Sequence, residues 1–358
     1  MCRKIDIISV HLFPVKTGII NYFGDRQFVK KYSIKKHDVT SLRLVSPQNF
    51  NVDYKRDLNE AQYRAATSAE GPFLIIAGAG TGKTRTIVYR VSYLIECGVR
   101  PENILLLTFT RKAAREMLRR AVMLLDGRCE TVAGGTFHSF ANSLLRKYAH
   151  LLNYERNFTI LDQGDAQDVI NLIRSRLKLD AKGKRFPRKD TLYDLHSRSV
   201  NTLTPVQDIL AAEYPHFNEM LSDIEKVHLE YTAYKVQNNL MDYDDLLINL
   251  LKILKDNEPV RAFLSNQYKY IMVDEYQDTN KIQSEIIKYL CFIHQNIMVV
   301  GDDAQSIYSF RGSSIENIRS FPNEFKECTI IKLEENFRSS QPILNLANEV
   351  LKRAVPST

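Results

Sequence analysis

A glycine-rich segment, Gly78-Ala-Gly-Thr-Gly-Lys-Thr84, has the residue types needed to hold a phosphate group. It follows the apolar run Phe73–Ala77 and precedes a helical stretch that begins at Arg85. Glycines let the backbone curl so that several N–H groups point at one phosphate, and a helix N-terminus adds partial positive charge. We expect Lys83 to contact the β- and γ-phosphates of a nucleotide and Thr84 to ligate Mg²⁺. The expected cradle consists of Ala77, Gly78, Ala79, Gly80, Thr81, Gly82, Lys83 and Thr84.

This segment departs at one position from the strict GxxxxGK[ST] pattern. Ala77 stands where the pattern has its first glycine. That position needs only a small side chain, so the departure leaves the chemistry intact. The flanking strand and helix favour a nucleotide site over a glycine-rich turn without a ligand.

Two carboxylates, Asp274 and Glu275, directly follow the apolar run Tyr270–Val273. The C-terminal ends of parallel strands are where such sheets bind ligands. We expect Asp274 to hold Mg²⁺ through water and Glu275 to accept a proton from the water that attacks the γ-phosphate. Many strands end in acidic residues, but together with the glycine-rich loop this pair predicts a nucleotide-hydrolysing site.

The elements that must position these residues form an α/β pattern. Four near-continuous apolar runs read as buried parallel strands: Phe73–Ala77, Ile104–Leu107, Tyr270–Val273 and Ile297–Val300. Residues 141–245 show helical periodicity instead, for example behind the plausible N-cap Asp162. We therefore expect residues 58–140 and 246–328 to form one nucleotide-binding domain, with residues 141–245 as an inserted helical subdomain.

The composition is that of a soluble globular protein. The 358 residues are 44% hydrophobic and 25% charged, and the length suits about two domains. No apolar run approaches the ~18 residues of a membrane span. Asp6 and His11 interrupt the apolar N-terminal stretch, so we expect neither export nor a membrane partner. The five cysteines include no CxxC pair, which fits reduced thiols in the cytoplasm.

The positive net charge comes from the N-terminal extension. The chain carries a formal charge of +7, but residues 1–57 hold 11 Lys/Arg against 5 Asp/Glu. The remaining 301 residues hold 38 Lys/Arg against 37 Asp/Glu. The basic balance therefore describes an extension of unknown role, and any prediction of nucleic-acid binding must come from motifs.

From about residue 58 to residue 348, the sequence resembles the UvrD/Rep/PcrA helicases of superfamily 1. Besides the loop and the acidic pair, five segments occur in the family's order: Leu58-Asn-Glu-Ala-Gln62, Leu107-Thr-Phe-Thr-Arg-Lys-Ala-Ala114, Gly135-Thr-Phe-His-Ser139, Gly301-Asp-Asp-Ala-Gln-Ser-Ile-Tyr-Ser-Phe-Arg-Gly312 and Leu333-Glu-Glu-Asn-Phe-Arg-Ser339. The resemblance implies a RecA-like P-loop NTPase domain, a parallel sheet flanked by helices. It also implies ATP and Mg²⁺ as cofactors and ATP-driven movement along DNA in the 3′ to 5′ direction.

The resemblance assigns further residues to the nucleotide. It implies that Gln62 reads adenine and that Phe337 stacks on it. Gln305 would sense the γ-phosphate, and Arg338 would act as an arginine finger on the charge that develops during hydrolysis. Arg85 is expected beside the nucleotide.

The resemblance also implies a single-stranded DNA track and single-strand/duplex junctions as substrates. A motor that moves on any sequence needs aromatic planes for base stacking, each contributing roughly 1–3 kcal/mol. Core packing is an equally good explanation for any one of these aromatics. The expected DNA-binding residues are Thr108, Phe109, Phe137, His138, Tyr308, Phe310 and Arg311.

Three positions depart from the family's pattern. Phe310 stands where tryptophan is usual, Arg111 where asparagine is usual and Glu335 where glutamine is usual. The chain contains no tryptophan, and phenylalanine still stacks, so we expect a weaker grip on DNA through the same mechanism. The change at Glu335 places a carboxylate near the nucleotide.

Residues 329–358 are expected to be a truncated start of a second RecA-like domain. The family's later motifs are not in the chain, so we expect nucleotide binding with slow hydrolysis, and no unwinding unless a partner chain supplies that domain. Two alternatives remain. The chain could be a nucleotide-dependent single-strand-binding module or remnant without catalysis, or the motor half of a helicase–nuclease.

Overall fold

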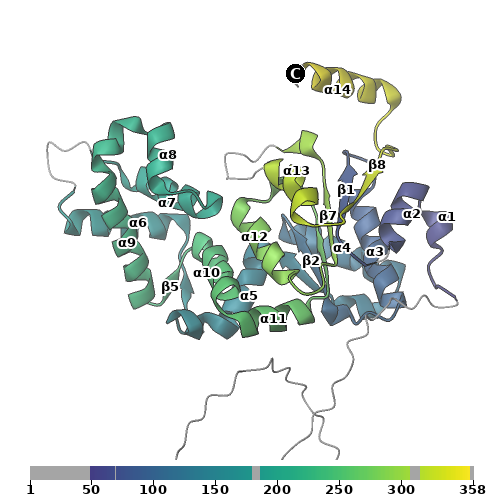
Figure 1. The fold of residues 1–358 in the computed structure, drawn as a ribbon, viewed down its shortest axis with the longest axis horizontal. Coiled ribbons are helices and arrows are strands. Elements are labelled where there is room, and N and C mark those ends of the chain that lie inside the picture. The colour runs from purple at the N-terminus through teal and green to yellow at the C-terminus, as the bar shows by residue number, and fades with distance from the viewer. Residues whose placement is uncertain (1–48, 69, 180–185, 307–314, 355–358) are drawn as a thin grey trace, which may run out of the picture. The chain divides into compact units, whose positions relative to one another are not determined.

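The computed structural model describes residues 49–354, apart from residues 69, 180–185 and 307–314. Its main sheet has six parallel strands in the order β3-β2-β6-β7-β1-β8 (Figure 1). The four predicted strands all belong to it, so the predicted α/β fold is confirmed. The strands are β1 (Phe73–Ala77), β2 (Ile104–Thr108), β3 (Ala133–Thr136), β6 (Tyr270–Val273), β7 (Ile297–Gly301) and β8 (Thr329–Leu333).

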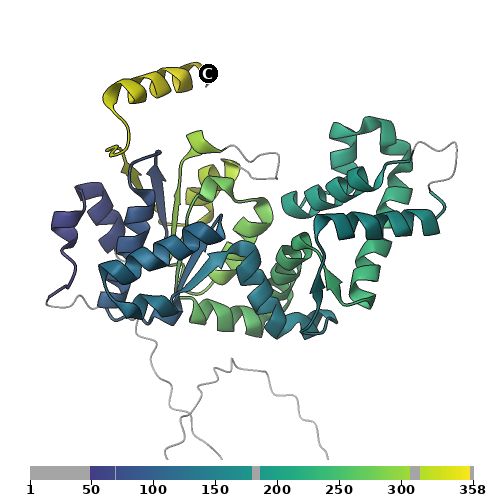
Figure 2. The same cartoon turned by 180° about the vertical axis from the view of Figure 1, so that it is seen from behind.

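Both faces of the sheet are apolar because helices cover both. Along β2, Leu105 and Leu107 belong to one core cluster, whereas Ile104 and Leu106 belong to the other. This alternation follows from the two-residue period of a strand. One face packs against α2 (Glu60–Thr67), α3 (Lys83–Glu96) and α4 (Arg111–Leu124) (Figure 2). The other packs against α5 (Phe137–Tyr148), α10 (Tyr243–Asp256), α11 (Glu258–Gln267), α12 (Lys281–Leu290) and α13 (Ile315–Glu324) (Figure 1).

The helical insert has its own core, but it is shorter than the sequence predicted. Its cluster extends from Leu161 to Tyr231 and is separate from the two clusters of the sheet. Residues 141–148 were expected in the insert, yet Ala141, Leu144 and Leu145 of α5 pack on the sheet. The insert contains α6 (Gln163–Arg176), α7 (Lys189–Thr202), α8 (Val206–Glu213), α9 (Leu221–Gln237) and the short parallel pair β4 (Thr159–Ile160) and β5 (Leu240–Met241).

The prediction that residues 329–333 begin a second RecA-like domain is wrong. This segment is β8, and it pairs in parallel with the whole of β1, from Phe73 beside Thr329 to Ala77 beside Leu333. Ile331 and Leu333 point into the sheet's core, whereas Ile330 is exposed, as expected of an edge strand. Sequence alone gave no sign of the pairing because a short alternating strand fits any sheet edge. The assignment of residues 334–358 stays a prediction.

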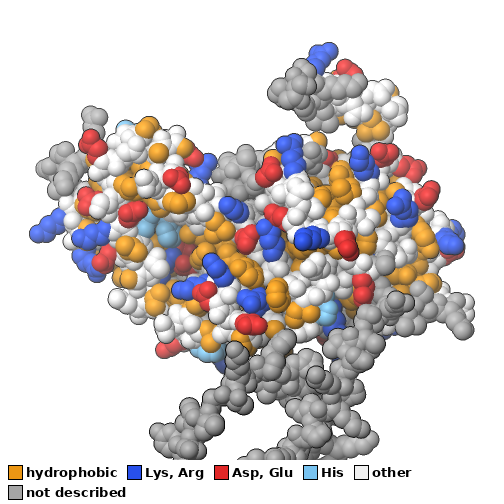
Figure 3. All heavy atoms as spheres, in the orientation of Figure 1, with side chains coloured by type: hydrophobic (Ala, Val, Ile, Leu, Met, Phe, Trp, Pro, Cys, Tyr) orange, Lys and Arg blue, Asp and Glu red, His pale blue; other side chains and the backbone are white. Residues whose placement is uncertain are grey.

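Two helices flank the domain in sequence: α1 (Tyr54–Asp57), which has four residues, and α14 (Gln341–Ala354), which has 14. The face shown in Figure 3 carries Lys and Arg side chains interspersed with Asp and Glu, which agrees with the near-neutral balance of residues 58–358. Within the described part of the chain, no helix combines the length and the apolar character that a membrane crossing requires.

Candidate functional site: a nucleotide cleft and a second cleft that share an acidic turn

The glycine-rich loop has the backbone that a phosphate cradle requires. Gly80 and Gly82 have φ angles of 83° and 91°, in the left-handed region that glycine tolerates best. Gly82 is the N-cap of α3 and supplies no side-chain cap, so the first N–H groups of this helix remain available to an anion. The Thr81 hydroxyl donates to the carbonyl of Gly78 at 2.8 Å, and this hydrogen bond stabilises the conformation of the loop.

Lys83 is buried and paired with the acidic strand end. Its Nζ donates to Oε2 of Glu275 at 2.7 Å, and only 10% of its side chain is exposed. The same oxygen accepts from Nε2 of Gln277 at 2.9 Å. Glu275 has a φ of 51°, an unusual backbone for a residue with a side chain. Such strain concentrates at functional sites because the surrounding structure must hold it.

The carboxylates beside Lys83 suit a magnesium ion. Asp274 is buried, and its Oδ1 has no hydrogen-bond partner. Burial, together with the neighbouring Glu275, raises the pKa of Asp274 to about 7. Asp278 also has a buried oxygen without a partner, and its pKa is raised to about 6 for the same two reasons. These carboxylate oxygens are suitable ligands for Mg²⁺, which prefers oxygen. The residue Thr84, whose hydroxyl can supply a further oxygen ligand, lines the same cleft.

A cleft of about 510 Å³ brings the three predicted catalytic residues together. Glu275, Gln305 and Arg338 all line it, although they come from three separate segments of the chain. Nε2 of Gln305 donates to Asp302 at 2.5 Å, so the side chain is held within reach of the cleft. The parts of the site that the sequence predicted separately are therefore assembled by the fold.

The segment after β8 lies against the phosphate loop. The backbone N–H of Phe337 donates to the carbonyl of Gly80 at 2.9 Å, and Nδ2 of Asn336 donates to the carbonyl of Ala79 at 2.6 Å. A β-carbon on Gly80 would come within 2.6 Å of Cβ of Arg338, so only glycine permits this approach. The ring of Phe337 is 62% exposed and free to stack on a base.

The carboxylate of Glu335 has a specific partner. Its Oε2 accepts from Nδ2 of Asn59 at 2.8 Å. Asn59 is the N-cap of α2, and Gln62 completes the capping box on the same helix. The departure at position 335 therefore ties the segment after β8 to the helix that carries Gln62.

Gln62 and Arg85 differ in how they relate to the loop. Gln62 is buried, and its Nε2 donates to the carbonyl of Thr81 at 2.9 Å, so it lies against the loop. Its role as the adenine reader stays a prediction. Arg85 instead donates to the carbonyl of Asp57 at 2.6 Å and lies over the ring of Tyr89. In this structure Arg85 is turned away from the loop, and its nucleotide role stays a prediction.

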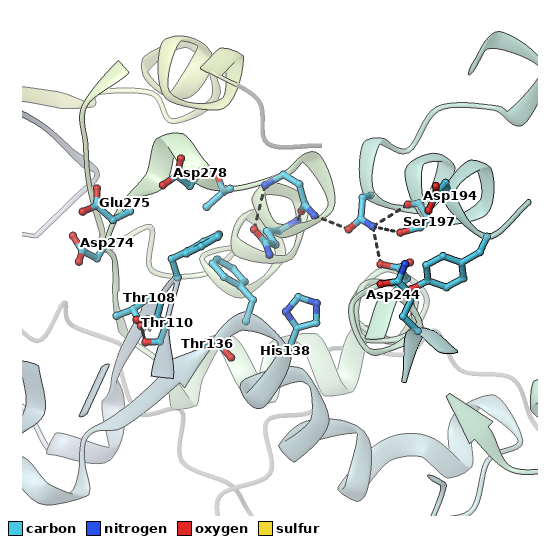
Figure 4. A pocket seen from close by; sticks show the side chains of 18 residues that line it. Thr108, Thr110, Thr136, His138, Asp194, Ser197, Asp244, Asp274, Glu275 and Asp278 are labelled. Atoms are coloured by element: carbon cyan, nitrogen blue, oxygen red, sulfur yellow. Dashed lines mark hydrogen bonds between the residues drawn. The ribbon is translucent and has the colours of Figure 1, made fainter. Parts of the chain in front are cut away.

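A second cleft, of about 730 Å³, lies between the sheet and the insert and holds most of the predicted DNA-binding residues (Figure 4). Figure 4 shows Asp274, Glu275 and Asp278 at one end, His138 and Thr136 along the cleft, and Asp194, Ser197 and Asp244 at the other end. Phe109, Thr110, Asp274, Glu275 and Asp278 line both clefts. The two clefts therefore meet at the segment Glu275–Asp278, which we call the acidic turn.

The predicted DNA-binding residues differ in availability. Phe109 is 38% exposed, whereas Phe137 is 5% exposed and packs in the sheet's core cluster. Phe109 is therefore the better stacking surface in this structure. Burial lowers the pKa of His138, which favours its neutral form. Thr108 is buried, and its hydroxyl donates to the carbonyl of Thr110.

Three of the predicted DNA-binding residues, Tyr308, Phe310 and Arg311, lie outside the described residues.

Gln277 is a site residue to which the sequence reasoning gave no role. It is buried, donates to Glu275, and accepts at Oε1 from the backbone N–H of Asp302 at 3.1 Å. A β-carbon on Gly301 would lie 2.7 Å from that Oε1, so the glycine makes room for it. Gln277 thus links the acidic turn to the segment that carries Gln305. Its position in the sequence between Glu275 and Asp278 could have indicated a role in the site.

The parallel sheet, the glycine-rich loop at the start of α3 and the acidic end of β6 define a RecA-like P-loop NTPase domain. Residues 58–326 match the family model of the UvrD/REP helicase N-terminal domain. The chain therefore belongs to the UvrD/Rep helicase family, as the motif series predicted.

Relatives with a described activity are similar over most of this chain. The ATP-dependent DNA helicase PcrA of Staphylococcus aureus is 40% identical over 299 residues, which cover 82% of this chain and 40% of the relative. The PcrA helicase of Bacillus subtilis is 39% identical over 296 residues, covering 82% and 39%. The chain thus spans about two fifths of the length of these relatives.

Proposed function

We propose that this chain is the ATP- and single-strand-binding part of an ATP-dependent DNA helicase. The observation that carries the proposal is that two clefts share the acidic turn Glu275–Asp278. One is the nucleotide cleft, and the other holds most of the predicted DNA-binding residues. A motor must link hydrolysis to its grip on DNA, and one shared segment provides a short route between the two. The relatives named as DNA helicases support the same function.

Lys83 and Glu275 suggest how nucleotide binding prepares the site for hydrolysis. In this structure each neutralises the other at 2.7 Å. The phosphates of ATP present more negative charge to Lys83 than one carboxylate does, so binding draws its ammonium toward them. Glu275 is then released to accept a proton from the attacking water. Mg²⁺, held by Thr84 and Asp274, would neutralise charge on the phosphate oxygens.

The lining of the second cleft suggests how a strand would lie in it. Its described lining residues include five carboxylates and no Lys or Arg. Phosphate groups are repelled from such a surface, whereas bases are uncharged. We therefore expect bases to enter, with Phe109 as a stacking surface and the backbone at the mouth.

The test is steady-state ATP hydrolysis with and without a thymidine oligonucleotide, alongside fluorescence titration of an ATP analogue. Lys83→Ala should lose at least about tenfold in analogue affinity, because it removes the buried charge that meets the phosphates. Lys252→Ala, on the exposed side of α10, is the matched control and should behave as wild type. Lys83-dependent turnover that rises with the oligonucleotide supports the motor function. Binding of both ligands without turnover would favour the alternative of a non-catalytic binding module, and equal analogue binding by Lys83→Ala would contradict the proposed site.

A further inference from the structure

Asn201 joins three helices through one side-chain amide. It lies near the C-terminal end of α7, and its Nδ2 donates to Oδ1 of Asp244 on α10 at 2.7 Å and to the carbonyl of Ser197 at 2.9 Å. Its Oδ1 accepts from Nδ2 of Asn280 at 2.7 Å. Figure 4 shows dashed hydrogen bonds that reach Ser197 and Asp244 at one end of the second cleft. Both ends of the amide are therefore in use.

The orientation of this amide is determined from both sides. Oδ1 of Asn280 accepts from the backbone N–H of Gln283 as the N-cap of α12, so Asn280 must present its Nδ2 to Asn201. The carboxylate of Asp244 can only accept while it is ionised, so Asn201 must present its Nδ2 there. No residue that only donates or only accepts could make both contacts.

One end of this bridge leads to the acidic turn. Asn280 follows the turn Tyr276–Asp278 after a single residue, Thr279. The carbonyl of Thr279 accepts from Nδ2 of Asn317 at 2.9 Å, so this connection is held from a second side. A displacement of Asn280 is therefore passed to the turn through two covalent links.

The other end leads to the insert. Leu192 and Leu195 of α7 lie in the insert's own core, whereas Val200 and Leu203 pack against the core of the sheet. Asn201 thus lies where α7 passes from one packed unit to the other. It also lines the 730 Å³ cleft beside Asp244 and Ser197. A ligand that enters the cleft and shifts the insert must act on this bridge.

We propose that Asn201 is a positioning residue that couples occupancy of the second cleft to the acidic turn of the nucleotide site. This inference rests on the proposed function, because it takes the cleft's ligand to be a single strand of DNA. The coupling is a difference in free energy between sites and must be reciprocal: DNA changes nucleotide affinity by the same factor by which nucleotide changes DNA affinity. Loss of this half-buried hydrogen-bonded bridge should reduce that factor by about five- to tenfold.

Three variants distinguish a coupling role of Asn201 from a purely stabilising role. Asn201→Asp keeps the size and the acceptor for Asn280, but it removes the donor and places two carboxylates together. Asp244→Asn alone is the matched control, because the new amide still offers an oxygen to Nδ2 of Asn201. In the double variant, Asn201→Asp with Asp244→Asn, the amide at position 244 donates to the carboxylate at position 201, so the bridge is rebuilt with its polarity reversed.

The measurement is the dissociation constant of a fluorescent, non-hydrolysable ATP analogue with and without a saturating thymidine oligonucleotide, and the reciprocal titration. We expect a ratio of at least about fivefold in wild type and Asp244→Asn, a ratio near one in Asn201→Asp, and recovery in the double variant. A purely structural role would lower the melting temperature and leave the ratio unchanged, which would overturn the inference. So would a wild-type ratio of one. The proposed function fails separately, if wild type binds neither ligand or if Lys83→Ala binds the analogue as wild type does.

Discussion

The sheet and the insert each bury a lysine beside carboxylates. The two clusters differ in how many of their polar atoms have a partner. In the insert, Lys235 is fully buried and donates to Asp242 at 2.6 Å, with Asp245 at 2.7 Å. Burial alone would lower the pKa of Lys235, but the two carboxylates outweigh it and hold that pKa above its usual value. At the phosphate loop, Lys83 has one carboxylate partner, Glu275, whose side chain is 34% exposed.

The carboxylates differ in the same way. Both oxygens of Asp242 are used: Oδ1 accepts from the backbone N–H of Asp245, and Oδ2 accepts from Lys235 and from the hydroxyl of Tyr231. Asp274, in contrast, has a buried oxygen without a partner. A buried polar group left unpaired costs free energy that a ligand can recover. The completed cluster therefore holds the fold together, whereas the incomplete one is suited to bind a cation and a nucleotide.

The largest expected effect is on the completed cluster. Lys235→Met should lower the free energy of unfolding by roughly 3–5 kcal/mol, because it leaves two buried carboxylates without their cation. Urea denaturation followed by circular dichroism measures this. Lys226→Met, on the exposed side of the same helix, is the control. A loss below about 1 kcal/mol would mean that the cluster is not structural.

A buried histidine beside this cluster gives the insert a predictable acid sensitivity. Burial lowers the pKa of His228 to about 4, despite its contact with the carbonyl of Leu192 at 3.0 Å. The unfolded chain binds a proton near pH 6.5 and the folded chain does not, so stability falls as the pH drops from 6.5 toward 4. Relative to His228→Gln, wild type should lose about 2–3 kcal/mol of unfolding free energy between pH 7 and pH 4.

His216→Gln, at an exposed position, is the control for this pH series and should follow wild type. Urea denaturation at each pH supplies the unfolding free energies. Parallel curves for wild type and His228→Gln would show that His228 does not titrate differently on folding.

The smallest expected effect is at the incomplete cluster, and its sign is opposite. Without nucleotide or Mg²⁺, Asp274→Asn should stabilise the protein by about 1–2 kcal/mol, because it removes a buried, under-bonded charge. Thermal unfolding near pH 8 measures the change, with the exposed Asp256→Asn as control. Destabilisation by Asp274→Asn would show that Asp274 supports the fold, and the contrast between the two clusters would not hold.

Much of the nucleotide site could be predicted because its residues are close in sequence. The strand, the curl and the helix start from Phe73 to Glu96 form one local unit, and the structure has them where the sequence predicted them. The sequence also indicated the acidic strand end. It did not indicate that Asn336 and the N–H of Phe337 bind the phosphate loop, since those contacts join residues more than 250 positions apart.

The sequence by itself determined the fold class, the phosphate loop and the family, because each rests on local spacing: strand and helix periods, glycines in a short loop and a series of motifs in order. Only the tertiary structure decided which sheet β8 joins, which lysine cluster is complete and that Asn201 bridges the insert to Asn280. Those features depend on contacts between strand edges and side chains that are far apart in sequence. The pattern of residue types along the chain does not specify such contacts directly.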